Sequence, residues 1–161
     1  MRAADDLSEP ADRPAVAAFA LGAAGLLPPL PGICLRLLDS GDATGQASGM
    51  LLLAGLVYGG LILSFLGGMW WGAACARRTG AALRPWLQLA VMPSLLALMA
   101  LAACVSNARV GGALLGVALV ATLLVDRKLV ANAMVPDWWM RLRVPLSCGL
   151  AVEMIASGSL V

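Results

Sequence analysis

Residues 50–76 read MLLLAGLVYGGLILSFLGGMWWGAACA and contain no charged residue. A helix rises about 1.5 Å per residue, and roughly 20 residues cross a hydrocarbon core about 30 Å thick. The stretch is longer than that minimum and predicts a transmembrane helix. The other helices of the chain are expected to pack around it.

Small residues recur at four-residue spacing in this stretch and again after residue 110. In a bilayer, small side chains let helix backbones approach closely, and van der Waals packing then holds the helices together. The spacing predicts a packing face. This face serves either other helices of the same chain or a dimer or partner interface. The predicted packing residues are Gly55, Gly59, Gly60, Ser64, Gly68, Gly72, Gly112 and Gly116.

The composition indicates a membrane protein with few side chains that could catalyse a reaction or bind a metal. Of its 161 residues, 61% are hydrophobic and 12% are charged, against about 45–50% and about 25% in soluble domains. The chain has no histidine, and its four cysteines are widely spaced. These features argue against histidine catalysis and against the common metal sites. The net charge of +2 is too small to suggest a nucleic-acid partner. We therefore expect no enzyme activity, no cofactor, no metal and no nucleic-acid partner.

The predicted fold class is all-α: a polytopic bundle of five transmembrane helices. Residues 1–14 are polar and are expected to form a disordered cytoplasmic tail, and residues 15–161 a single transmembrane domain. Pro28, Pro29 and Pro31 predict a kink in the first helix. A short interfacial helix is expected before the fifth. The predicted helices span about 15–38, 49–76, 85–104, 110–126 and 145–160.

The connections between these helices are expected to be polar loops. Residues 39–48 predict a turn-rich loop, and residues 126–144 form the longest internal connection. Aromatic and basic residues favour the headgroup region of a membrane. The predicted interfacial anchors are Trp70, Trp71, Trp138, Trp139, Arg141 and Arg143. For Trp70 and Trp71, a ring platform for a quinone or lipid headgroup is the alternative.

Basic residues alternate between the two sides of the predicted bundle. The tail and the loops after the second and fourth helices carry nine of the 11 basic residues, and the opposite side carries Arg36 and Arg109. By the positive-inside rule, the N-terminus is cytoplasmic and the C-terminus lies outside. Five helices satisfy this arrangement.

Glu153 is the one carboxylate well inside a predicted span. Ionisable groups at such depth are costly and often functional. Three interpretations remain open: a protonatable or ion-binding group, a neutral acid hydrogen-bonded to Ser64 or Gln88, or a shifted helix that leaves Glu153 near the surface. Glu153, Ser64 and Gln88 are the candidate intramembrane polar site.

Several motifs resemble a small membrane-protein family catalogued as domain of unknown function 3429, which is similar to transmembrane protein sixty-nine. The motifs are YGGLILSFLGGMWWG at 58–72, MPSLLAL at 92–98, Asp126, and PDWWMRLRVPL at 136–146. The family tends to have histidine or arginine where this chain has Trp70. The resemblance implies a multi-helix bacterial or mitochondrial inner-membrane protein and implies no activity. For this chain, we expect the bacterial inner (plasma) membrane, with a periplasmic C-terminus.

The functional prediction is a non-enzymatic accessory or assembly component of a membrane complex. Its expected partners are the lipid bilayer and either a membrane complex or further copies of the chain. One alternative is a small oligomeric transporter or channel that uses Glu153. Another is a lipid- or quinone-binding protein that uses the tryptophans of the cytoplasmic side.

Overall fold

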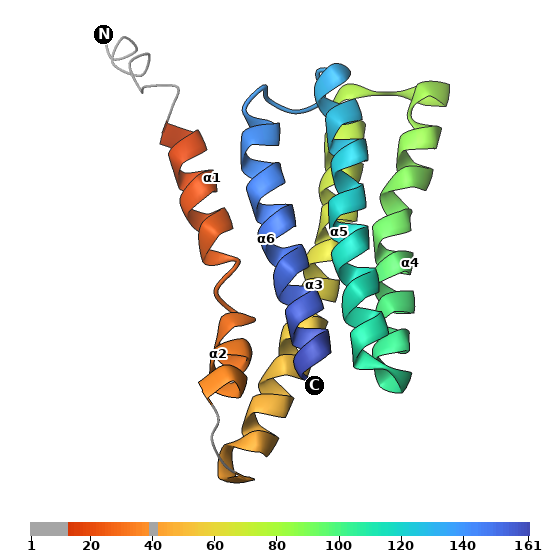
Figure 1. Cartoon of the computed structure of the whole chain (residues 1–161). Helices are drawn as coiled ribbons and strands as arrows, with labels where there is room; N and C mark the ends of the chain where they lie inside the picture. Colours follow the sequence, from red (N-terminus) through yellow and green to blue (C-terminus); the bar gives the residue numbers. More distant parts are fainter. Residues whose placement is uncertain (1–12, 39–41) are drawn as a thin grey trace, which may run out of the picture.

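The computed structural model describes residues 13–38 and 42–161, and this part of the chain is all-α, as the sequence predicts. Helices α3 to α6 form a bundle, and α1 and α2 lie along one side of it (Figure 1). There α1 packs against α6, while α2 packs against α3 and α6. The elements are α1 Arg13–Ala24, α2 Leu30–Leu38, α3 Asp42–Arg77, the 3-10 helix η1 Gly80–Ala82, α4 Arg84–Ser106, α5 Ala108–Ala131 and α6 Trp139–Leu160.

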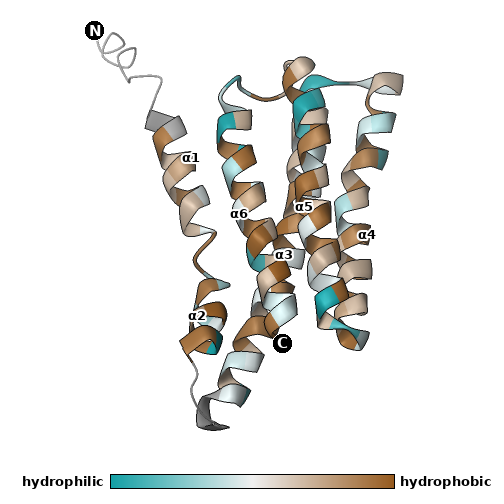
Figure 2. Cartoon of the chain, in the orientation of Figure 1, coloured by the Kyte–Doolittle hydropathy of each residue, from teal (hydrophilic) through white to brown (hydrophobic). Residues whose placement is uncertain are grey.

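Within the described residues, three segments are long and apolar enough to cross a membrane by length and composition. They are Gly45–Arg77, Gly80–Ser106 and Ala108–Ala131. Apolar positions fill the middle of the bundle, and hydrophilic positions gather toward the helix ends (Figure 2). The structure is therefore compatible with membrane insertion. The predicted total of five spans stays a prediction.

Helix α3 begins earlier than the sequence predicts. Residues 42–48 belong to α3, although a polar loop was expected at 39–48; residues 39–41 lie outside the described part. Helix α2 packs closely on α3 at residues 51 and 52. A methyl group added at Gly32 of α2 would lie 2.8 Å from the backbone carbon of Leu51, so only glycine permits this approach. With about 1.5 Å of rise per residue, the 36 residues of α3 extend about 54 Å.

Two short helices replace the single kinked helix that was expected first. The helix α1 ends at Ala24, residues 25–29 form turns, and α2 starts at Leu30. Proline lacks a backbone donor and restricts the preceding residue, which explains the break at Pro28 and Pro29. Pro29 is buried against α3, where a methyl group added at Gly55 would lie 3.3 Å from its Cβ. Of the predicted disordered tail, residues 1–12 lie outside the described part, and residue 13 begins α1.

The structure has no separate interfacial helix in the fully described connection between α5 and α6. Helix α5 runs on to Ala131, and α6 begins at Trp139. Ala133 has a positive φ of 54°, and the Met134 amide donates to the Leu129 carbonyl at 2.9 Å. This left-handed residue and this bond form a compact C-terminal cap. The cap turns the chain back into the bundle, and the predicted interfacial segment becomes the first turns of α6.

Two clusters of buried side chains hold the bundle together. The larger cluster joins all four bundle helices and includes Leu63, Ala100, Leu115 and Met154. The smaller cluster lies near the C-terminal end of α5 and consists of Trp70, Ala90, Leu129 and Met134, with partly buried neighbours. The smaller cluster borders the polar groups described next.

Candidate functional site

A buried polar network joins α3, α5 and α6. Asp126 of α5 accepts a hydrogen bond from the Trp70 indole nitrogen at 2.9 Å and forms an ion pair with the Arg143 Nε at 2.8 Å. Arg143 also donates through Nη2 to the Thr122 Oγ1 at 3.2 Å, and Thr122 donates to the Leu119 carbonyl at 2.6 Å. The residue exposures are 3% for Trp70, 0% for Asp126 and 5% for Arg143.

Helical spacing places these polar residues on core-facing sides of α5 and α6. Thr122 and Asp126 follow Leu115 and Leu119 at three- or four-residue intervals, so they share the buried face of α5. Arg143 precedes buried positions of α6 at the same intervals. This register is the sequence signal that could have revealed the network. Arg127, which follows Asp126 directly, points outward and is exposed.

The network satisfies charges that could not otherwise be buried. An isolated charge in an apolar interior is strongly unfavourable, whereas a paired and hydrogen-bonded charge is tolerated. Both carboxylate oxygens of Asp126 have a partner, one in α3 and the other in α6. The three helices are therefore tied together at one end of the bundle.

The structure corrects the interfacial assignment for Trp70 and Arg143. Both side chains are buried inside the bundle, because each points toward Asp126. Trp71 and Arg141 are exposed. For these two, anchoring in the headgroup region stays a prediction.

Trp138 and Trp139 are half-buried and lie beside α1. The ring centroids of Phe19 and Trp138 are 6.4 Å apart, and those of Trp138 and Trp139 are 6.2 Å apart. These distances suit tilted aromatic contacts. The tryptophan pair thus connects α1 to the start of α6, and a role at the membrane surface stays a prediction for it.

The small residues of α3 do not form a single face. Gly60 faces α4, where an added methyl group would lie 2.7 Å from the Leu101 Cδ1, and Ser64 shares a 2.9 Å hydrogen bond with Ser94 of α4. In contrast, a methyl group added at Gly68 or Gly72 would meet no heavy atom within 4 Å beyond its own stretch of helix backbone. Four residues advance a helix by about 400°, so each step drifts by about 40°. The small residues at four-residue spacing on α3 therefore turn gradually away from α4 along the helix.

The other predicted glycines make close contacts inside the chain. Gly59 faces Met154 of α6, and Gly55 faces the proline turn before α2. A methyl group added at Gly112 would lie 2.5 Å from the Met154 carbonyl oxygen, and one at Gly116 would lie 2.9 Å from the Ile155 Cγ1. These positions allow α5 and α6 to pack closely.

The structure does not bring Glu153 together with Ser64 and Gln88. Ser64 is bonded to α4, Gln88 is exposed, and no hydrogen bond between the described residues joins either one to Glu153. Glu153 is half-buried in α6, and its Oε2 has no hydrogen-bond partner. The predicted three-residue polar site is therefore not assembled.

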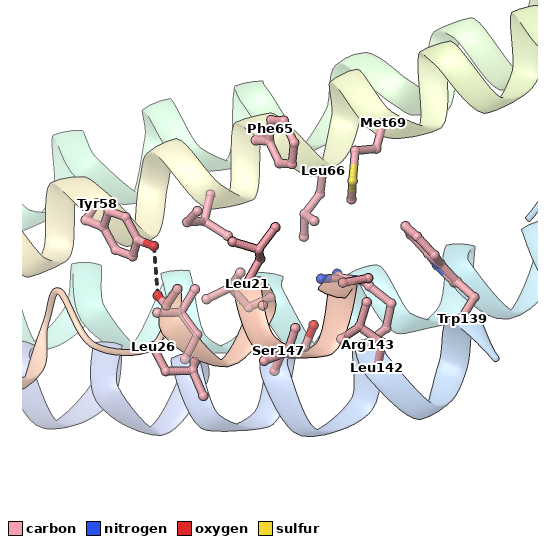
Figure 3. Close-up of a pocket in the computed structure, with 17 residues that line it drawn as sticks. Leu21, Leu26, Tyr58, Phe65, Leu66, Met69, Trp139, Leu142, Arg143 and Ser147 are labelled. Carbon is pink, nitrogen blue, oxygen red and sulfur yellow. Dashed lines mark hydrogen bonds between the residues drawn. The ribbon is translucent and has the colours of Figure 1, made fainter. Parts of the chain in front are cut away.

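A cavity of about 520 Å³ lies between α1, α3 and α6 (Figure 3). Its walls are largely apolar and include Leu21, Phe65 and Leu66. At one end, the Tyr58 hydroxyl donates to the Gly25 carbonyl at 2.7 Å and links α3 to the turn after α1.

The opposite part of the cavity carries polar groups from α6. Trp139 lies at the end away from Tyr58, and Arg143 and Ser147 lie between them (Figure 3). The Trp139 Nε1 and the Ser147 Oγ are buried and have no hydrogen-bond partner. Because Arg143 both lines the cavity and bonds to Asp126, it connects the cavity to the Asp126 network. Sequence analysis missed the cavity, since its walls come from four segments that are distant in the chain, including Leu119 of α5.

The chain matches a family model described as "Protein of unknown function (DUF3429)" over residues 14–158. The chain belongs to the DUF3429 family. No curated protein and no solved structure is significantly similar to it. In this DUF3429 protein, the matched region contains every residue of the network and every residue that lines the cavity.

The donor set of this DUF3429 chain suits hydrogen bonding better than metal binding. Across residues 13–38 and 42–161, no group of three histidine, cysteine, aspartate or glutamate side chains could hold a metal ion. Within the same ranges, the cysteines Cys34, Cys75, Cys104 and Cys148 are all free. The polar atoms at the cavity are instead N–H and O–H donors, which can bind an oxygen acceptor.

Proposed function

We propose that this protein is a non-enzymatic accessory or assembly component of a complex in the bacterial inner membrane. The observation that carries the proposal is the outward-facing half of the small-residue stripe on α3. Gly68, Gly72 and Ala76 are exposed, and an added methyl group at either glycine meets no other atom. We call these three residues the open groove.

The open groove supports a docking role because of its shape. A neighbouring helix can approach a glycine-lined surface more closely than it can approach leucine or phenylalanine. Phe65 and Trp71, which are exposed beside the groove, provide bulky apolar edges. A partner helix, from a larger complex or from another copy of this chain, would gain contact with both the backbone and these edges.

Filling the open groove should release the partner while leaving the monomer folded. We expect the double variant Gly68→Leu/Gly72→Leu to reduce recovery of the partner about tenfold, equivalent to about 1.4 kcal/mol of binding energy. The measurement is native mass spectrometry of the protein extracted gently from its own membrane. Gly49→Leu is the matched control, because Gly49 also lies on α3 and has open space around it. Equal recovery from the double variant and the control, or a lone wild-type monomer, would contradict the proposal.

We also propose that the N-terminus is cytoplasmic and the C-terminus periplasmic. In this arrangement the α1–α2 pair crosses the membrane once, and α3, α4, α5 and α6 each cross it once. The distribution of basic residues supports this orientation. Alkaline phosphatase fused after Val161 is expected to be active, because it folds only after export, and a fusion after Gly80 is expected to be inactive. The reverse pattern of activity would overturn the proposed orientation.

A further inference from the structure

The cavity between α1, α3 and α6 contains polar groups that the chain itself leaves unsatisfied. Ser147 is 2% exposed, lines the cavity, and its Oγ has no partner; the Trp139 Nε1 is likewise buried and unpaired. Buried polar atoms in native proteins are nearly always hydrogen-bonded, and an unpaired one is costly in an apolar surrounding. Helix α6 has four such atoms, and these two belong to residues that line the cavity, so we infer that their missing partner comes from outside the chain.

We propose that this cavity binds one uncharged amphiphile, whose head accepts hydrogen bonds through carbonyl oxygens and whose tail is hydrocarbon. Two sources share this chemistry: an isoprenoid quinone and an ester-linked glyceride. The cavity volume of about 520 Å³ falls within the range of small-molecule sites, which is roughly 300–1,000 Å³. This inference does not depend on the helix-docking role proposed above.

The hydrogen-bonding side chains of the cavity favour a ligand whose head group accepts hydrogen bonds. The Trp139 indole N–H and the Arg143 guanidinium can only donate, and the Ser147 hydroxyl can donate as well. All three belong to α6 and line the cavity (Figure 3). A carbonyl oxygen offers two lone pairs to such donors. A head made only of donors would leave the indole unpaired.

The ion pair selects against a charged head. Asp126 already neutralises Arg143 at 2.8 Å, and both residues are buried. A carboxylate or phosphate in the cavity would therefore add a charge that nothing in the network compensates. Such a buried charge is unfavourable, whereas a neutral carbonyl oxygen is not penalised in this way.

The remaining cavity surface suits the tail. Leu21 of α1 and Phe65 of α3 line the cavity and are 75% and 62% exposed, so they mark its open side. The tail can extend between these two helices toward the hydrocarbon of the bilayer. The Tyr58–Gly25 hydrogen bond lies at the end of the cavity away from Trp139.

Binding of defined amphiphiles to the full-length protein in detergent tests the proposal. The probes are decylubiquinone, dioctanoylglycerol, dodecanoate and dodecane, and native mass spectrometry measures retained ligand. We expect either or both of the uncharged carbonyl probes to bind at least tenfold more tightly than dodecanoate and dodecane. Comparison of the first two probes distinguishes a quinone from a glyceride. Equal binding of all four, or no binding of either carbonyl probe, overturns the proposal.

Variants show whether the bound probe occupies this cavity. Ser147→Ala and Trp139→Phe each remove one donor, and each is expected to weaken binding about 3- to 10-fold, the worth of one hydrogen bond. Ser159→Ala and Trp71→Phe are matched controls, since Ser159 bonds to the Ile155 carbonyl and neither residue lines the cavity. Affinities unchanged in both cavity variants would overturn the proposed contacts.

Two further measurements separate ligand binding from a structural role. Ala18→Phe places a ring in the cavity and is expected to abolish binding, whereas Ala20→Phe, on the exposed side of α1, is expected to preserve it. Ser147→Ala should leave the ligand-free protein as stable as the wild type or more stable, because it removes an unpaired hydroxyl. Binding that survives Ala18→Phe, or a destabilised ligand-free Ser147→Ala protein, would contradict the proposal.

Discussion

Replacement of Arg143 with alanine is expected to lower the free energy of unfolding by about 3–5 kcal/mol, the usual loss when one partner of a buried ion pair is removed. Asp126 would keep its bond to Trp70 but would lose the only guanidinium bonded to it among the described residues. Thermal or denaturant unfolding in detergent micelles, followed by tryptophan fluorescence, measures the change. Arg141→Ala is the matched control, because Arg141 lies two residues earlier on α6 and is exposed.

The double variant Asp126→Leu/Arg143→Leu distinguishes an unpaired charge from a simple loss of packing. Apolar replacement of both partners is often neutral or stabilising, since neither residue then carries an uncompensated charge. We expect the double variant to recover most of the stability that Arg143→Ala loses. An Arg143→Ala protein as stable as the Arg141→Ala control would show that the ion pair does not hold the helices together.

Substitution of Gly112 by leucine should produce the second large effect, because this glycine lies at a close approach of α5 and α6. An added Cβ would be 2.5 Å from the Met154 carbonyl oxygen and 3.0 Å from the Gly158 Cα. Both neighbours are backbone atoms, so the helices themselves must move apart. Overpacking of this kind costs about 1–3 kcal/mol, and displaced helices would add to that loss.

The matched control for Gly112→Leu is Gly72→Leu. Gly72 also lies within a long apolar helix, but no heavy atom surrounds an added methyl group there. Leucine has a higher helix propensity than glycine, so this control should unfold no more easily than the wild-type monomer. Equal stability of the two leucine variants would contradict the close α5–α6 packing.

The sequence alone was sufficient to predict the all-α class and the three long apolar helices. Length and uninterrupted hydrophobicity are properties of a segment, and residues 50–76 show them without reference to any neighbour. The helix ends were less accurate. The cap at Ala133 and the packing of Gly32 on α3 involve contacts that a segment does not reveal.

The candidate sites depended more strongly on tertiary structure. Trp70 and Arg143 lie next to stretches typical of the membrane surface, which favoured an interfacial assignment, yet both point inward. Their shared partner, Asp126, is 56 residues from one and 17 from the other. Only the rotation of α3, α5 and α6 about their axes brings these three side chains together.

By itself, the sequence determined that this protein is largely helical, with three long apolar segments and glycines that recur along them. The tertiary structure decided which glycines are covered, which charges are buried and where the cavity opens. The physical reason is that hydrophobicity acts along each helix, whereas pairing and packing depend on which faces meet. Those faces are fixed by the crossing of helices that are distant in the chain.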